Sequence, residues 1–170
     1  MNQVYTIFRF IKAIASSEKM CAIAVFYLLF SLSVKAQFIP SAQSAKKVST
    51  LIAQTFGDNI SAVPLAINSN YQSIEVDGKM NGYVCVEQAS SKHDKFEFVV
   101  IYDDQLNILQ VKVLLYREDY GYEIKSKRWL KQFSTREVRK VQAISGATIS
   151  VNSLKNAVKH LNHKMEEFVL

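Results

Sequence analysis

The strongest constraint on the fold is a pair of β-type runs near the middle of the chain. Residues 96–102 are almost continuously aromatic or β-branched, and residues 108–116 include Val111, Val113 and Leu115 at alternating positions. Such residues favour strands, and alternation is typical of a strand with one buried face. The polar segment 103–107 between the two runs predicts a turn. We therefore expect these residues to form an antiparallel hairpin.

Before the hairpin, the sequence predicts one helix and two more strands. Apolar residues at helical spacing follow Ala45, and Gly57 provides a C-terminal stop. Residues 58–70 contain a proline and are expected to be irregular. Residues 71–76 and 82–88 are β-type runs on either side of an Asp-Gly turn region. The apolar positions of the helix are Val48, Leu51, Ile52, Thr55 and Phe56.

After the hairpin, the sequence predicts two helices. Apolar and aromatic residues indicate a short helix within residues 125–133, and a longer amphipathic helix is expected over residues 150–168. The predicted fold class is therefore α+β, a single domain over residues 45–170 with a small antiparallel sheet flanked by N- and C-terminal helices. The apolar stripe of the last helix consists of Val151, Leu154, Val158, Leu161, Met165 and Phe168.

Residues 1–36 have the pattern of a secretory signal peptide. Three basic residues and one acid precede residues 21–34, a mostly apolar run of 14 uncharged residues. This length suits a signal peptide, whereas spanning a bilayer takes roughly 20 residues. Val34 and Ala36 are small residues at the spacing that signal peptidase recognises, so cleavage is expected after Ala36. Export to the periplasm or the outer face of the cytoplasmic membrane is expected, whether the segment is cleaved or retained as an anchor, and residues 37–44 would form a linker.

Charge and cysteine content exclude some classes of function. Without residues 1–36, the chain keeps 17 of its 21 basic and 14 of its 15 acidic residues, a net charge of +3. This modest charge and the expected export argue against nucleic-acid binding. The whole chain has two cysteines, too few for a disulfide framework or a four-thiolate zinc site. After export Cys85 would be the only thiol, and we expect it to be a buried small hydrophobe.

No sequence signal indicates a metal site. His160 and His163 are three residues apart on the last predicted helix, a spacing that would permit shared coordination. Both flank the apolar stripe, and no carboxylate or thiolate partner is evident. We therefore expect these two histidines to face solvent, and His93 to lie in a loop.

The segment that opens the last helix is the most informative for function. It reads Ser145-Gly-Ala-Thr148 and continues with Ile149 and Ser150. The glycine and alanine leave the backbone uncovered, and the helix start presents unpaired N–H groups at the positive end of the helix dipole. These features suit a phosphate group. The structural alternative is N-capping, since serine and threonine commonly begin helices.

This segment resembles the S/T-G-A-T-x-T/S motif of the FMN-binding domain family. That family includes one component of the sodium-pumping NADH:quinone oxidoreductase and one component of Rnf-type complexes. Residues 116–124 and 127–133 also resemble the small exported members, and the similarity covers roughly residues 81–161. The resemblance implies a domain that works outside the cytoplasm.

In that family an FMN transferase joins FMN through its phosphate to the last threonine of the motif, which corresponds to Thr148. The resemblance implies an exported, membrane-associated electron-transfer flavoprotein, modified through a phosphoester bond, rather than a self-contained enzyme. Its partners would be the transferase and membrane or exported redox proteins. The residues expected at the flavin are Ser145, Gly146, Ala147, Thr148, Ile149, Ser150, Glu118, Tyr120, Gly121, Tyr122 and Glu123.

The wall expected to face the motif has two interpretations. As part of a flavin site, Tyr120 and Tyr122 would pack on the ring, and Glu118 and Glu123 would meet the ribityl hydroxyls. As ordinary structure, the tyrosines would be half-buried beside a turn. Glu118 would then form a surface ion pair with Arg117, which contributes less than about 1 kcal/mol.

One position departs from the family pattern. An aspartate usually lies six residues before the acceptor threonine, as part of what the transferase recognises, and this chain has Gln142 there. The alternative function is therefore a cofactor-free exported binding or interaction module, which retains the fold without being flavinylated.

Overall fold

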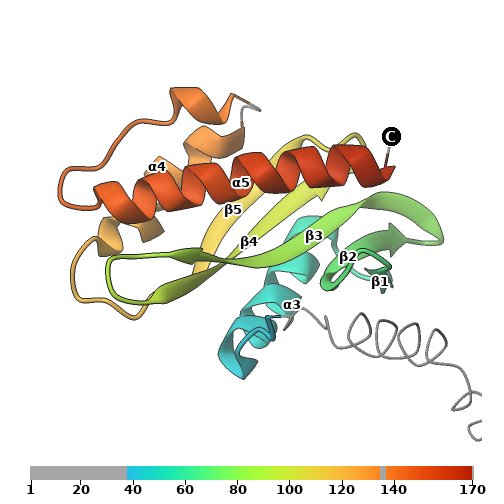
Figure 1. Cartoon of the computed structure of the whole chain (residues 1–170). Helices are drawn as coiled ribbons and strands as arrows, with labels where there is room; N and C mark the ends of the chain where they lie inside the picture. The colour runs from blue at the N-terminus through green and yellow to red at the C-terminus, as the bar shows by residue number, and fades with distance from the viewer. Residues whose placement is uncertain (1–37, 135–136, 170) are drawn as a thin grey trace, which may run out of the picture. The chain divides into compact units, whose positions relative to one another are not determined.

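Five antiparallel strands in sequential order form the sheet of this computed structural model (Figure 1). The structure describes residues 38–134 and 137–169, so the signal peptide predicted over residues 1–36 lies outside the described residues. In this sheet β1 and β5 are the two edge strands. The strands are β1 (Ile60–Leu65), β2 (Asn68–Val76), β3 (Lys79–Ser90), β4 (Lys95–Asp103) and β5 (Ile108–Leu115).

Two helices cover opposite faces of the sheet (Figure 1), which confirms the predicted α+β class. They are α3 (Ala42–Phe56) and α5 (Thr148–Val169). None of the helices described by the structure combines the length and the apolarity needed to cross a membrane. Between β5 and α5 lie one short α-helix and three 3₁₀ segments: η1 (Tyr122–Lys125), α4 (Lys127–Leu130), η2 (Lys131–Ser134) and η3 (Val138–Lys140).

Strand β4 contributes to a separate core on each face of the sheet. Phe98 and Val100 belong to the core under α5, whereas Val99 and Ile101 belong to the core under α3. Successive side chains of a strand point to opposite faces, so a strand buried on both sides needs a continuous apolar run. This explains the unusually apolar composition of β4.

The predicted apolar stripe of α5 is confirmed for five of its six residues. Phe168 is the exception, because it is 41% exposed. The next residue, Val169, packs against the core in its place. Phe168 lies three positions after Met165 and Val169 lies four positions after it, and at this last turn the fourth position faces the sheet. The buried residues are Val151, Leu154, Val158, Leu161 and Met165.

The prediction that residues 58–70 are irregular is wrong, because they form β1 and the start of β2. Pro64 lies within β1 and is paired with Gln72. Proline is tolerated there because β1 is an edge strand. Such a strand forms backbone hydrogen bonds with one neighbour only, so fewer of them depend on the N–H group that proline lacks. The register shifts directly after Pro64.

The helix boundaries also differ from the expected ones. Helix α3 begins at Ala42, so part of the expected linker 37–44 is helical, and the Ser41 hydroxyl caps it by accepting the Ser44 N–H at 3.2 Å. Helix α5 begins at Thr148, two residues earlier than predicted. In the predicted helix 125–133, only α4 is α-helical and the flanking turns are 3₁₀.

Cys85 is buried, as predicted. Its Sγ lies 3.6 Å from the Sδ of Met165, under helix α5. Burial, with a smaller contribution from Glu87, raises the pKa of this thiol well above its usual value. The thiol therefore packs as an apolar group.

Candidate functional site

The Ser145–Thr148 motif forms a tight turn that leads directly into α5. The Ala147 N–H donates to the Ile144 carbonyl at 3.2 Å, and the Ala147 carbonyl accepts the Val151 N–H at 2.9 Å. Ala147 is thus the N-cap residue, directly before the first residue of α5, and its methyl group cannot cap the helix. Gly146 has φ of +80°, in the left-handed region that favours glycine.

The hydroxyls of the motif do not cap α5. Ser150 is buried, and its Oγ lies 2.9 Å from the Tyr116 hydroxyl oxygen. Ser145 and Thr148 are exposed, and within residues 38–134 and 137–169 neither hydroxyl has a hydrogen-bond partner. The first N–H groups of the helix likewise have no acceptor in this part of the chain. The N-capping alternative is therefore wrong, and the helix start is open to an anion.

Gly121 brings the segment after β5 against the motif. A Cβ atom at Gly121 would lie 3.0 Å from the Tyr116 hydroxyl oxygen and 3.3 Å from the Ala147 Cβ. The Tyr116 hydroxyl also donates to the Tyr120 carbonyl at 3.0 Å, in addition to its contact with Ser150. Tyr116 therefore joins the two segments, and a side chain at position 121 would crowd both of them.

Three large side chains predicted for the site are exposed. Tyr120 is 85% exposed, Tyr122 57% and Ile149 53%, and Glu123 on η1 is also exposed. The interpretation of both tyrosines as half-buried aromatics is therefore wrong. Exposed aromatic rings beside the motif are suited to contact with a planar aromatic ligand.

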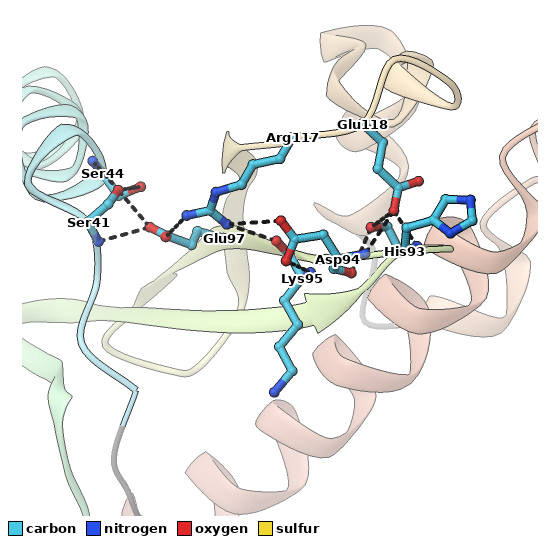
Figure 2. Close-up of polar contacts among 9 residues, drawn as sticks. Ser41, Ser44, His93, Asp94, Lys95, Glu97, Arg117 and Glu118 are labelled. Atoms are coloured by element: carbon cyan, nitrogen blue, oxygen red, sulfur yellow. Dashed lines mark hydrogen bonds and ion pairs between the residues drawn. The ribbon is translucent and has the colours of Figure 1, made fainter.

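The carboxylate of Glu118 holds the loop between β3 and β4 (Figure 2). It accepts the N–H groups of His93 at 2.6 Å and Asp94 at 3.0 Å, and also the Ser91 hydroxyl. These hydrogen bonds, that of Ser91 first, lower the pKa of Glu118 to about 2. The sequence interpretation placed this carboxylate at ribityl hydroxyls, whereas in the structure it organises a loop.

Arg117 pairs with Glu97 and not with Glu118 (Figure 2), so the predicted surface ion pair is wrong. Its Nη2 lies 3.2 Å from Oε1 of Glu97, whose side chain is 2% exposed. Its Nη1 donates to the Lys95 carbonyl at 3.0 Å and lies 4.0 Å from the Asp94 carboxylate. Arg117 and Glu118 thus bind the same hairpin from adjacent positions.

The Glu97 carboxylate links this region to the start of α3 (Figure 2). Its Oε2 accepts the Ser41 N–H at 3.1 Å and the Ser41 hydroxyl at 3.0 Å. Burial raises the pKa of Glu97, but hydrogen bonds from Ser44, Ser41 and Arg117 together outweigh it and hold the pKa below its usual value. The charged carboxylate therefore connects Arg117, in the segment after β5, to Ser41 at the start of α3.

A pocket of about 580 Å³ lies beside the motif, within the usual size range for small-molecule sites. Three segments form it: the β3–β4 loop, the segment after β5 and the motif turn. Sequence reasoning did not assign Lys92, His93 or Asp119 to the site, because nothing in the local pattern distinguishes them from other polar residues of predicted loops. The lining residues are Lys92, His93, Arg117, Glu118, Asp119, Tyr120 and Gly146.

The backbone of Gln142 is held on both of its polar groups. Its carbonyl accepts the Trp129 Nε1–H at 2.8 Å, and its N–H donates to the Gln132 Oε1 at 2.9 Å. The residue itself is exposed. Position 142 is therefore fixed in the backbone while its side chain is accessible to another protein.

The histidines predicted to face solvent do so. His160 and His163 are exposed, and Nε2 of His163 lies 3.4 Å from the Glu167 carboxylate. Among the residues that the structure describes, no group of three or more His, Cys, Asp or Glu side chains could hold a metal ion. His93 lies in the β3–β4 loop, as predicted.

Comparison with known families finds a match over this region. Residues 92–162 match the model of the FMN-binding domain family. No curated protein matches the chain. The matched segment contains the pocket, the Ser145–Thr148 motif and most of α5, and this confirms the family resemblance found in the sequence.

Proposed function

We propose that this FMN-binding domain carries its FMN covalently, through a phosphoester bond to Thr148, and that the protein transfers electrons outside the cytoplasm. The observation that carries the proposal is the exposed Thr148 hydroxyl at the first position of α5, next to N–H groups that have no acceptor among the described residues. A phosphate on this hydroxyl would lie at the positive end of the helix dipole.

The surrounding residues fit a tethered flavin. Gly146 leaves open space, because a Cβ atom there would have no neighbour within 4 Å. Lys92 brings a positive charge into the pocket, and Tyr120 offers an exposed ring beside it. Bound FMN would supply the redox chemistry, while these residues bind and orient it. Because Glu118 and Arg117 hold the hairpin, the pocket wall is fixed before the flavin arrives.

The proposed location and partners follow from the sequence. The signal-peptide pattern of residues 1–36 supports export to the periplasm or to the outer face of the cytoplasmic membrane. The partners would be an FMN transferase, which attaches the flavin, and membrane or exported redox proteins, which exchange electrons with it. Gln142 is exposed, which supports contact with the transferase at this position.

Co-expression with an FMN transferase tests the attachment. We expect flavin fluorescence in a denaturing gel and a mass increase equal to FMN minus water, because forming the ester removes the hydroxyl proton from Thr148 and one hydroxyl group from the FMN phosphate. Both signals should vanish in Thr148→Ala and persist in Thr50→Ala, a matched control that removes an exposed threonine hydroxyl outside the motif. Labelling that survives Thr148→Ala would contradict the assignment of the attachment residue.

The second candidate is a cofactor-free exported interaction module. The observation that favours it is Gln142, which supplies no carboxylate at the position of the family aspartate. The test is to co-express the chain with a transferase that labels a second substrate in the same experiment. If the second substrate is labelled and this chain is not, the cofactor-free alternative is supported.

A further inference from the structure

We propose that a groove along the edge strand β5 binds an extended acidic segment of a partner protein. The groove has a volume of about 530 Å³ and lies between β5 and the η1–α4–η2 region, with Thr55 of α3 at one side. It is distinct from the pocket beside Thr148, and the proposal does not depend on flavin attachment. Four lysines line it: Lys112, Lys125, Lys127 and Lys131.

The charge of the groove is unbalanced. No acidic residue lines it, and within the described part of the chain none of the four lysine side chains has an ion pair or hydrogen bond. The chain without residues 1–36 has a net charge of +3, so these four charges exceed the net charge of the whole exported part. Unpaired like charges repel one another, and an anionic ligand removes this repulsion.

The groove runs along the edge of a strand. Five consecutive residues of β5, residues 109–113, line it. Because successive side chains point to opposite faces, a groove in contact with all five follows the edge of the strand. In the described sheet β5 pairs only with β4, so its other edge offers backbone groups to an added strand. Five residues of extended chain span about 17 Å.

Edge protection alone does not account for the lysines. Lysine on an edge strand prevents unwanted pairing, and Lys112 suits that role. The other three lysines come from η1, α4 and η2 and line the groove from the opposite wall. They would pair with acidic side chains of an added strand and would repel a second copy of β5, which carries its own Lys112.

The groove also contains apolar residues, so a partner segment needs apolar side chains as well as acidic ones. Val111, Val113 and Leu130 line it and are buried, and Leu109 is an exposed large hydrophobic residue at its side. An extended segment in which acidic residues alternate with β-branched ones would direct one set of side chains to the lysines and the other to these apolar residues.

A peptide probe tests the proposal on the full-length chain, prepared without flavin. The probe is a short capped peptide in which glutamate alternates with valine, and binding is measured by fluorescence anisotropy. We expect the triple variant Lys125→Glu, Lys127→Glu, Lys131→Glu to bind at least ~10-fold more weakly. The control triple variant Lys46→Glu, Lys79→Glu, Lys159→Glu, with the same net charge, should bind within about twofold of the unmodified chain. Amide exchange at residues 109–113 should slow on binding.

Three outcomes would overturn the proposal. Equal weakening in both triple variants would mean that the probe responds to net charge and not to the groove. Equal binding of a probe with alternate backbone nitrogens methylated would mean that no strand is added to β5. Lysine-dependent binding to vesicles of anionic lipid, without binding of the peptide, would assign the groove to a membrane surface instead. Far-ultraviolet circular dichroism of each variant verifies that it is folded.

Discussion

Gly121 is the single residue on which the junction between the pocket wall and the motif depends most directly. Its φ is +75°, and a Cβ atom would crowd the Tyr116 hydroxyl and the Ala147 methyl group. We expect Gly121→Ala to lower the free energy of unfolding by about 1–3 kcal/mol, measured by urea denaturation. It should also reduce flavin occupancy after co-expression with the transferase.

Gly78→Ala is the matched control for this substitution. Gly78 has nearly the same φ, +76°, but nothing lies within 4 Å of its Cβ position. Only the backbone strain remains, which costs about 1 kcal/mol. The difference between the two variants measures the crowding at the motif, and equal losses would mean that the contact with Tyr116 and Ala147 is unimportant.

Gln142 is expected to limit the yield of flavinylation. Restoring a carboxylate with Gln142→Asp should raise flavin occupancy at a fixed level of transferase, as judged by intact mass. Stability should change by less than about 0.5 kcal/mol, because the side chain is exposed and the backbone is held through Trp129 and Gln132. Gln142→Asn serves as the uncharged control, and the same yield in all three proteins would count against a role for this carboxylate.

Single residues also show where sequence reasoning about the site succeeds and where it stops. The Ser145–Thr148 motif could be recognised from its residue pattern and its place directly before a predicted helix. The contacts of Glu118 could not, because its partners include backbone N–H groups of a loop about 25 residues earlier, and every residue except proline has such a group. The place of Lys92 at the pocket could not be predicted either, because it depends on how the same loop is held.

At the scale of elements, the β3–β4 loop depends on an ionised Glu118. The pKa of this carboxyl is about 2 in the folded protein and about 4.3 in an unfolded chain. Its stabilising effect is therefore present above about pH 4.3 and is lost as the pH falls toward about 2. We expect Glu118→Gln to show a smaller decrease of the melting temperature across this range than the unmodified protein.

Glu123→Gln is the control for this pH dependence, since Glu123 is an exposed carboxyl on η1. Glu97 contributes in the same direction, because its pKa is also lowered, and its contribution remains in both variants. Identical pH profiles for Glu118→Gln and the unmodified protein would show that the loop does not need this charge.

The elements differ in how far the sequence predicts them. The β4–β5 hairpin and the face of α5 are predictable, because burial imposes periodic apolar residues on each. β1 is not, because Pro64 and exposed positions hide the strand, and only its pairing with β2 stabilises the extended conformation. The 3₁₀ turns around α4 are equally unpredictable, since Trp129, Leu130 and Phe133 are core residues in either helix type.

At the scale of the whole molecule, the core under α5 is closed to solvent. Cys85 lies within it, with 0% exposure and a raised pKa. In a Cys21→Ser background, where Cys85 is the only thiol, we expect alkylation by iodoacetamide at least ~10³-fold slower in native protein than in denaturant. Mass spectrometry follows the reaction, and rapid labelling of the native protein would show that α5 opens without global unfolding.

Trp129 has a further consequence for experiments on this protein. It is the only tryptophan of the chain, it is packed edge to face against Phe133, and its indole N–H binds the carbonyl of Gln142, six residues before Thr148. Tryptophan emits light at wavelengths that oxidised flavins absorb. Excitation energy would therefore pass from this one indole to a flavin on Thr148, and the emission lifetime would report, without any added dye, which molecules carry the cofactor.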